Sequence, residues 1–156
     1  MADIIMRSIL SAIKSDYPKI KFKVGDQYYW SPSLQTVFYA PLNNGSIDNV
    51  LLIHELSHAI LNHSSYKKDV DLLKIERQAW DKTLELASAY NVHVNTTEAN
   101  DALDSYRDWL HNRSVCPTCS AIGLEVDNKE YSCVACGTKW RPNEARICQL
   151  KRYKIK

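Results

Sequence analysis

Residues 47–63 read IDNVLLIHELSHAILNH, and they predict a buried helix that carries reactive side chains. His54 and His58 are four residues apart, so both imidazoles lie on one face of a helix and can reach the same metal ion. Glu55, one residue after the first histidine, can interact with a metal-bound water molecule beside them. Apolar residues flank this H-E-x-x-H motif, which predicts burial on several faces. Buried imidazoles need partners, and a metal ion supplies them; a hydrogen-bonded pair of core histidines is the alternative.

A catalytic zinc ion needs a third protein ligand, and two residues compete for this role. His63 lies five residues after His58, a step that in an unbroken helix rotates its side chain away from His58. We therefore expect His63 to contact a metal ligand and not the metal itself, or to interact as a protonated imidazole with the dipole at the helix C-terminus. Glu76 lies in the apolar stripe of a helix predicted over 70–90, where a carboxylate is costly unless it is paired or bound to metal. The sequence favours Glu76 as the third ligand, with a buried salt bridge as the alternative.

A second motif has the form C-x2-C…C-x2-C, and its members are Cys116, Cys119, Cys133 and Cys136. In a cytosolic chain this spacing is typical of zinc ligands, because disulfides are rare in that compartment. Two thiolates of one turn can face a single ion, and two such pairs complete a tetrahedral site with no open position. The motif predicts a zinc ribbon over 113–142 whose ion is structural. Cys148 is predicted to take no part in it.

The remaining sequence predicts an α+β fold. Apolar positions at helical spacing predict helices over 3–15, 47–63, 70–90 and 97–111. Alternating or β-rich stretches predict three short strands over 20–24, 28–30 and 36–40. Either Ser46 or Asp48 can cap the second helix. We expect three segments: a metal-binding domain over 1–112, the ribbon over 113–142 and a basic C-terminal tail over 143–156.

The chain of 156 residues carries 20 Lys and Arg against 18 Asp and Glu, and it is 45% hydrophobic. This composition is that of a globular protein and excludes collagen-like, low-complexity and disordered classes. No apolar run approaches the roughly 20 residues of a membrane span and no signal peptide is evident, so we expect a cytoplasmic protein with no membrane partner. Residues 141–156 hold six basic residues and one acidic residue. This stretch is either solvated or contacts nucleic acid or an acidic partner.

Residues 54–63, followed by Glu76-Arg77-Gln78-Ala79-Trp80, resemble the ImmA/IrrE family of metallopeptidases. That family is a minimal gluzincin, with an H-E-x-x-H helix and a downstream helix whose Glu-x-x-Ala-type motif supplies the third ligand. The likeness covers about residues 20–90. The ribbon is not typical of that family and is similar to the C-terminal zinc module of SprT-like proteases. Those enzymes usually take a third histidine, for which His93 is the candidate.

The resemblance implies a zincin-like fold for residues 1–112 and a zinc-dependent peptidase that acts on a specific protein or peptide substrate. One zinc ion per chain would be catalytic, held by His54, His58 and Glu76, and a second would be structural, in the ribbon. Glu55 would take the proton of the attacking water and deliver it to the leaving amine.

In gluzincin-like folds an edge strand that precedes the catalytic helix binds substrate by strand addition. The strand expected over 36–40 has this place in the sequence, so Val37, Phe38 and Tyr39 are the predicted substrate-binding residues. Two non-catalytic interpretations stay open. One is a ribbon-and-tail module that binds nucleic acid or a protein, and the other is a structural zinc protein whose own chain fills the fourth zinc position. Glu55 favours an enzyme, because a non-catalytic site has no chemical need for that carboxylate.

Overall fold

The structure is a computed structural model, and it describes residues 7–145 and 149–156. Arg146 and Cys148 lie outside these residues, as do the first residues of the helix predicted over 3–15. The chain divides into two compact units. The first unit contains the residues up to Ser64 together with Gln78–Asn95, and the second contains Ser65–Arg77 together with Thr96–Lys156.

Most predicted helices and strands form close to their expected bounds, but the first helix begins only at Ile9, with Ser8 as its cap, although residues 7 and 8 were expected to be helical. The first unit begins with α1 (Ile9–Asp16), β1 (Lys21–Val24), β2 (Tyr29–Ser31), β3 (Thr36–Tyr39) and α2 (Asn49–Ile60). Next come α3 (Asp69–Ala89), which continues through both units, and α4 (Thr96–Ser114). The ribbon region holds β4 (Leu124–Asp127), β5 (Glu130–Ser132), β6 (Lys139–Pro142) and β7 (Arg152–Ile155). Among the described residues, no helix combines the length and the apolarity that a bilayer crossing needs.

The strands of the first unit form one sheet in the order β1-β3-β2, with β1 parallel and β2 antiparallel to β3. The expectation that residues 36–40 form an edge strand is wrong, because β3 is the central strand and is paired on both sides. Val37 is fully buried and Tyr39 is also buried. The backbone of Val37, Phe38 and Tyr39 therefore has no open edge to which a substrate strand could be added.

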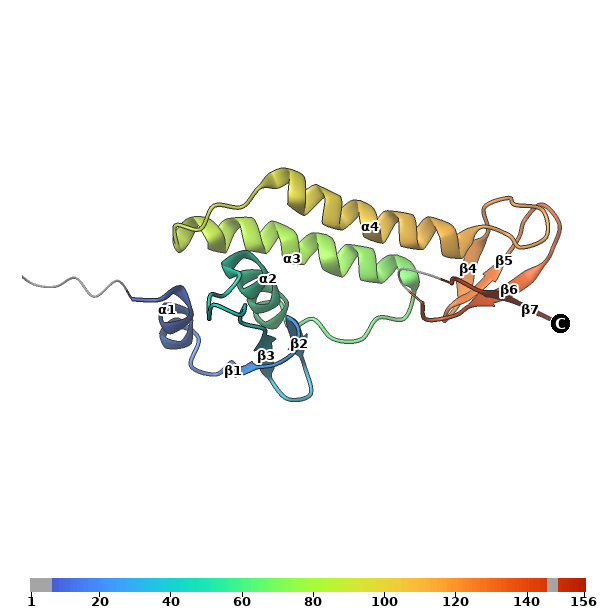
Figure 1. The fold of residues 1–156 in the computed structure, drawn as a ribbon. Helices are drawn as coiled ribbons and strands as arrows, with labels where there is room; N and C mark the ends of the chain where they lie inside the picture. The colour runs from blue at the N-terminus through green and yellow to red at the C-terminus, as the bar shows by residue number, and fades with distance from the viewer. Residues whose placement is uncertain (1–6, 146–148) are drawn as a thin grey trace, which may run out of the picture. The chain divides into compact units, whose positions relative to one another are not determined.

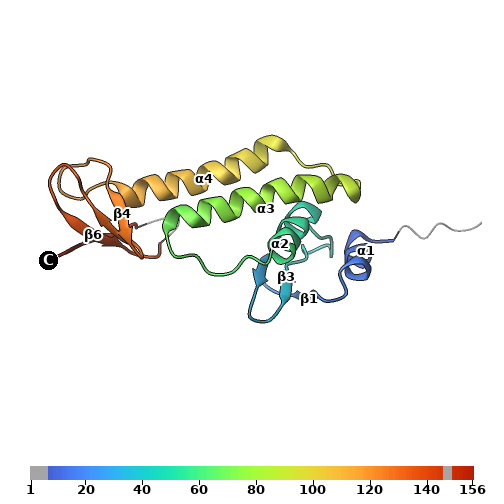
Figure 2. The same ribbon diagram turned by 180° about the vertical axis from the view of Figure 1, so that it is seen from behind.

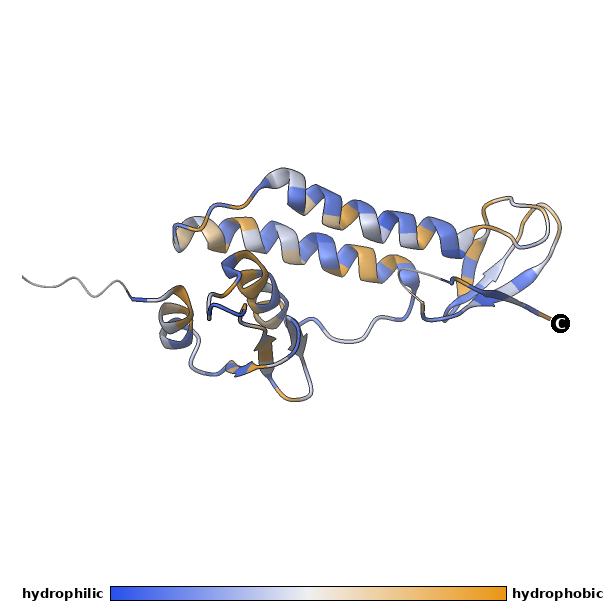
Figure 3. Cartoon of the chain, viewed as in Figure 1, coloured by the Kyte–Doolittle hydropathy of each residue, from blue (hydrophilic) through white to orange (hydrophobic). Residues whose placement is uncertain are grey.

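The core of the first unit is formed by this sheet, α1, α2 and the second half of α3 (Figure 1). Hydrophobic residues are concentrated in α2 and β3, as the orange colouring of Figure 3 shows. The buried members of the core are Ile13, Val37, Tyr39, Leu52, Ile53, Leu56, Leu86 and Ala87. The Asp48 carboxylate starts α2 by accepting the backbone N–H of Leu51 at 3.0 Å, which is the cap expected from the sequence. This helix is thus fixed at its start and packed along its length, so it is a rigid carrier for the H-E-x-x-H side chains.

The second unit contains the ribbon and the helix that leads into it, as the view from behind shows (Figure 2). Its sheet has the order β4-β5-β6-β7. Sequence patterns did not predict β7, which pairs with β6 in antiparallel register, with Lys154 opposite Trp140. The expected domain boundaries at 112 and 142 do not coincide with this unit, because both α4 and residues 149–156 belong to it. The basic stretch is therefore in part a strand of the ribbon sheet.

A buried ion pair ties the second unit together. The guanidinium of Arg113 donates from Nε to Oδ2 of Asp69 at 2.7 Å, and both side chains are fully buried. The hydroxyl of Tyr131 donates to the same Asp69 oxygen at 2.6 Å. Arg113 also donates to the backbone C=O of Asn143 and stacks on the Trp109 ring, 4.6 Å from its centroid. One carboxylate thus joins the first turn of α3, the end of α4 and β5.

Candidate metal centres

The side chains of His54, His58 and Glu76 converge on one point. Each offers one donor atom, and the three donor atoms lie within 4.8 Å of one another. The residues are 6%, 8% and 7% exposed, so all three are buried. The two histidines come from adjacent turns of α2, and Glu76 comes from α3. The structure therefore brings together the three residues that the sequence singles out for a metal ion.

The spacing of these atoms suits a small cation. The Nε2 atoms of His54 and His58 are 3.2 Å apart. An ion with tetrahedral geometry and metal–nitrogen bonds of about 2.1 Å holds its ligand atoms about 3.4 Å apart. Two imidazole nitrogens and a carboxylate oxygen also form a donor set that zinc accepts, with a fourth position left for water or substrate. The residues present therefore fit a zinc ion.

The other ring nitrogens of the two histidines have partners. Nδ1 of His54 lies 3.4 Å from the hydroxyl of Thr83, which donates to the backbone C=O of Ala79 at 2.6 Å. The Thr83 oxygen can therefore accept the N–H of His54. Nδ1 of His58 lies 2.9 Å from Nδ1 of His63. Both rings are thus held with Nε2 toward the cluster.

The end of α2 explains why His63 reaches His58. The helix ends after Ile60, and Asn62 adopts a left-handed conformation with φ 53°. The backbone N–H of His63 then donates to the C=O of His58 at 3.0 Å, and that of Asn62 donates to the C=O of Ala59 at 3.1 Å. These two bonds define a Schellman motif, which brings the sixth residue back against the first. The expectation that a five-residue step separates the two rings assumed an unbroken helix, and the chain turns before His63.

Glu55 is anchored to the sheet. Its Oε2 accepts the backbone N–H of Trp30 at 2.8 Å, and Trp30 belongs to the edge strand β2. The indole N–H of Trp30 donates to the backbone C=O of His63 at 3.0 Å. Sequence reasoning missed Trp30, because nothing in the local pattern of 28–30 indicates which helix lies beside that strand. The residue holds both the carboxylate of the motif and the turn that follows α2.

The four ribbon cysteines form the second cluster, and their sulfur atoms lie within 4.8 Å of one another. Cys116 and Cys136 have sulfurs 3.7 Å apart, and those of Cys119 and Cys133 are 3.5 Å apart. A tetrahedral ion with metal–sulfur bonds of about 2.3 Å separates its sulfurs by about 3.8 Å. The distances fit a four-thiolate zinc site with no position left for a substrate.

The two halves of the ribbon site have the same backbone turn. The N–H of Ser120 donates to the C=O of Cys116 at 3.0 Å, and the N–H of Gly137 donates to the C=O of Cys133 at 2.9 Å. Both residues have positive φ, 64° for Ser120 and 75° for Gly137, a conformation that glycine adopts without steric cost. Hydrogen bonding to Thr138 lowers the pKa of the Cys136 thiol, which favours the thiolate that metals bind.

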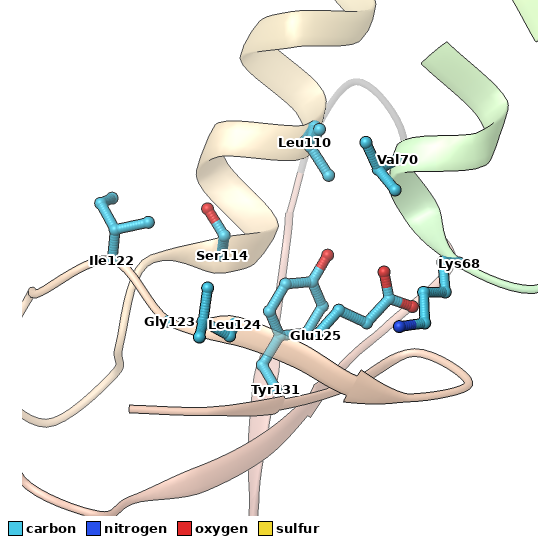
Figure 4. Close-up of a pocket in the computed structure, with 9 residues that line it drawn as sticks. All are labelled: Lys68, Val70, Leu110, Ser114, Ile122, Gly123, Leu124, Glu125 and Tyr131. Atoms are coloured by element: carbon cyan, nitrogen blue, oxygen red, sulfur yellow. The ribbon is translucent and has the colours of Figure 1, made fainter. Parts of the chain in front are cut away.

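An open cavity of about 430 Å³ lies in the second unit (Figure 4), and none of the candidate metal ligands lines it. Its lining comprises Lys68, Val70, Leu110, Ser114, Ile122, Gly123, Leu124, Glu125 and Tyr131. Tyr131 donates to Asp69, and Glu125 accepts the backbone N–H groups of Asp69 and Lys129 at 2.8 and 2.9 Å. Burial raises the pKa of Glu125. Because the Tyr131 hydroxyl and the Glu125 carboxylate already form hydrogen bonds within the protein, we assign no chemistry to the cavity.

No protein-family model, curated protein or solved structure matches the chain. The two donor clusters are therefore the observations from which a function can be argued.

Proposed function

We propose that the chain is a zinc-dependent metallopeptidase, with a catalytic ion at His54, His58 and Glu76 and a structural ion in the ribbon. The observation that supports this most strongly is the convergence of the three buried donor atoms within 4.8 Å, with Glu55 next to the first ligand. A purely structural zinc site is normally closed by four protein ligands, as the cysteine cluster is. Three protein donors beside a carboxylate favour an ion with one position open to the reaction.

The roles of the residues follow from where they are held. Zinc bound at this site would supply Lewis-acid activation of a water molecule and of the scissile carbonyl. His54 and His58 present Nε2 to the site, and Glu76 adds a negative charge to the donor set. Glu55 is the general base that takes the proton of the attacking water and passes it to the leaving amine nitrogen. The hydrogen bond from the Trp30 N–H to Oε2 restrains this carboxylate against the edge strand β2.

The proposal is tested by metal content and by one charge-removing variant. Elemental analysis of the purified chain should give close to two zinc ions per molecule. Cleavage of a generic unfolded protein should be abolished or reduced at least about 100-fold in Glu55→Gln, because general acid–base catalysis contributes about 10²–10⁴-fold. Glu85→Gln is the matched control, since Glu85 is an exposed glutamate that pairs with Lys82 on the surface. Cleavage that persists unchanged in Glu55→Gln would contradict the proposal.

A second candidate function is supported by β7. This strand places Lys154 on the ribbon sheet, with Lys151 just before it, and both side chains are exposed, so they can contact a phosphate backbone, whereas Arg152 donates to the backbone C=O of Val115. We propose this surface as a contact for nucleic acid, in addition to the peptidase or in its place. Binding of a labelled oligonucleotide should weaken steeply as salt rises and should weaken further in Lys151→Gln/Lys154→Gln. The same exchanges at Lys21 and Lys23, on β1 of the other unit, are the control.

A further inference from the structure

The contact between the rings of His58 and His63 restricts where the protons of the two rings can be. Their Nδ1 atoms are 2.9 Å apart, a hydrogen-bond distance that requires one of the two nitrogens to carry a proton and the other to lack it. The Nε2 of His58 faces His54 and the candidate metal position. A neutral imidazole that gives Nε2 to a cation has its proton on Nδ1. The proton between the rings therefore belongs to His58, and His63 accepts it.

The opposite side of the His63 ring agrees with this assignment. A neutral His63 that accepts at Nδ1 carries its own proton on Nε2. That atom lies 3.3 Å from Oε1 of Gln78, an oxygen that can accept it. The two hydrogen bonds thus run in one direction: His58 donates to His63, and His63 donates to the amide oxygen of Gln78.

The backbone holds His63 in this place independently of its side chain. The Schellman motif bonds its N–H to His58, and the indole of Trp30 bonds its C=O at 3.0 Å. The two rings meet edge to face, with centroids 5.0 Å apart. Because α2, β2 and the turn at Asn62 all fix the backbone of this residue, only its side-chain torsions remain to be ordered when its hydrogen bond to His58 forms.

We propose that His63 is a positioning residue for the metal ligand His58: it accepts the Nδ1 proton of His58 and thereby keeps Nε2 as the unprotonated nitrogen that faces the metal. Gln78 in turn selects the tautomer of His63. Partners of this kind orient the ring and raise the basicity of the ligating nitrogen, and their loss typically costs about 10- to 100-fold in metal affinity. The proposal rests on the metal centre of the proposed function and on none of its catalytic steps.

The test compares metal affinity at the two clusters of one full-length protein. Cobalt is titrated in competition with a chelator, and the absorbance of the thiolate ribbon is separated from that of the histidine–carboxylate site. His63→Phe should weaken binding at the histidine–carboxylate site about 10- to 100-fold and leave the ribbon unchanged. His63→Asn, whose amide oxygen can accept the same proton, should recover part of the loss. His93→Phe is the matched control, because His93 is an exposed histidine of the same unit and is not among the three residues whose donor atoms converge.

Equal cobalt affinity in His63→Phe and the wild type would overturn the proposal. If His63→Phe does not fold, the test is imidazole nitrogen NMR of the zinc-loaded wild type. We expect Nδ1 to be protonated in His58 and Nε2 alone to be protonated in His63. A His63 ring that is protonated on Nδ1 overturns the proposal. The two proposals fail separately. An active peptidase whose metal affinity ignores His63 refutes the positioning role, whereas weakened affinity in a protein without peptidase activity supports that role and refutes the enzyme.

Discussion

Replacing Asp69 by alanine should destabilise the second unit far more than the loss of an ordinary surface charge. Asp69 is fully buried and accepts hydrogen bonds from Arg113 at 2.7 Å and from Tyr131 at 2.6 Å. Without it, the equally buried guanidinium of Arg113 has no counter-charge. Breaking a buried ion pair from one side costs about 3–5 kcal/mol.

Other contacts of Arg113 and the loss of an acceptor for Tyr131 decide where in this range the destabilisation by Asp69→Ala falls. Arg113 keeps the C=O of Asn143 and the ring of Trp109 in the variant, which offsets part of the cost. The hydroxyl of Tyr131 loses its acceptor, and an unsatisfied buried hydroxyl costs about 1–3 kcal/mol. These effects oppose each other, so we expect a loss of about 3–5 kcal/mol in the free energy of unfolding. Against a typical total of about 5–15 kcal/mol, the loss would be readily measured.

The measurement is urea unfolding of the zinc-saturated chain, followed by tryptophan fluorescence. Trp109 and Trp140 are buried in the same unit and report its unfolding. Asp104→Ala is the matched control, because Asp104 forms an exposed pair with Arg107 one turn away on α4, and such pairs contribute about 0–1 kcal/mol. A loss in Asp69→Ala within about 1 kcal/mol of the control would refute the reasoning that one carboxylate joins α3, α4 and the ribbon.

Three further predictions concern packing, metal and pH. Gly123→Ala should lower the free energy of unfolding by about 1–3 kcal/mol, because its Cβ would lie 2.3 Å from the Trp140 ring; unchanged thermal stability would contradict this. Cys133→Ser should leave about one zinc ion per chain and lower the melting temperature, as seen by elemental analysis and calorimetry, and retention of two ions would exclude the ribbon site. Burial and the hydrogen bond to Asp16 raise the pKa of Tyr90. The protonated phenol therefore stabilises the folded state, and this contribution is complete below the ordinary tyrosine pKa near 10. It is lost as the pH rises through the higher pKa of the folded state. Absorbance titration should show a late phenolate component that Tyr90→Phe removes; loss of a component near pH 10 instead would show that Tyr90 titrates normally.

The two donor clusters could be anticipated from the sequence because their geometry is local. The i, i+4 spacing of His54 and His58 and the two-residue spacing within each cysteine pair bring donors together whatever the rest of the chain does. Glu76 required one further step, namely that a carboxylate in an apolar helical stripe needs a partner. These inferences depend on periodicity and on the cost of burying charge, both of which a single sequence displays.

The features that the sequence did not reveal depend on contacts between distant segments. Alternation predicts a strand at 36–40 but not its neighbours, so the central place of β3 was missed. The position of His63 depends on a left-handed residue, Asn62, that ends the helix one residue earlier. Asp69 has the appearance of an ordinary first-turn acid, and its pairing with Arg113 spans 44 residues. Local patterns carry no signal for such partners.

The order of strands in the first sheet also bears on how quickly the site can form. β2 and β3 are joined by a short turn, so they can pair as an antiparallel hairpin within microseconds. β1 pairs with β3 in parallel register and is separated from it in sequence by β2, so its pairing is less local and slower. We expect the hairpin to form early and β1 to join late. Trp30 lies in the early hairpin and later binds Glu55, so the strand that anchors the motif is in place before the sheet is complete. Pulse-labelling hydrogen exchange should then show protection in β2 and β3 ahead of β1.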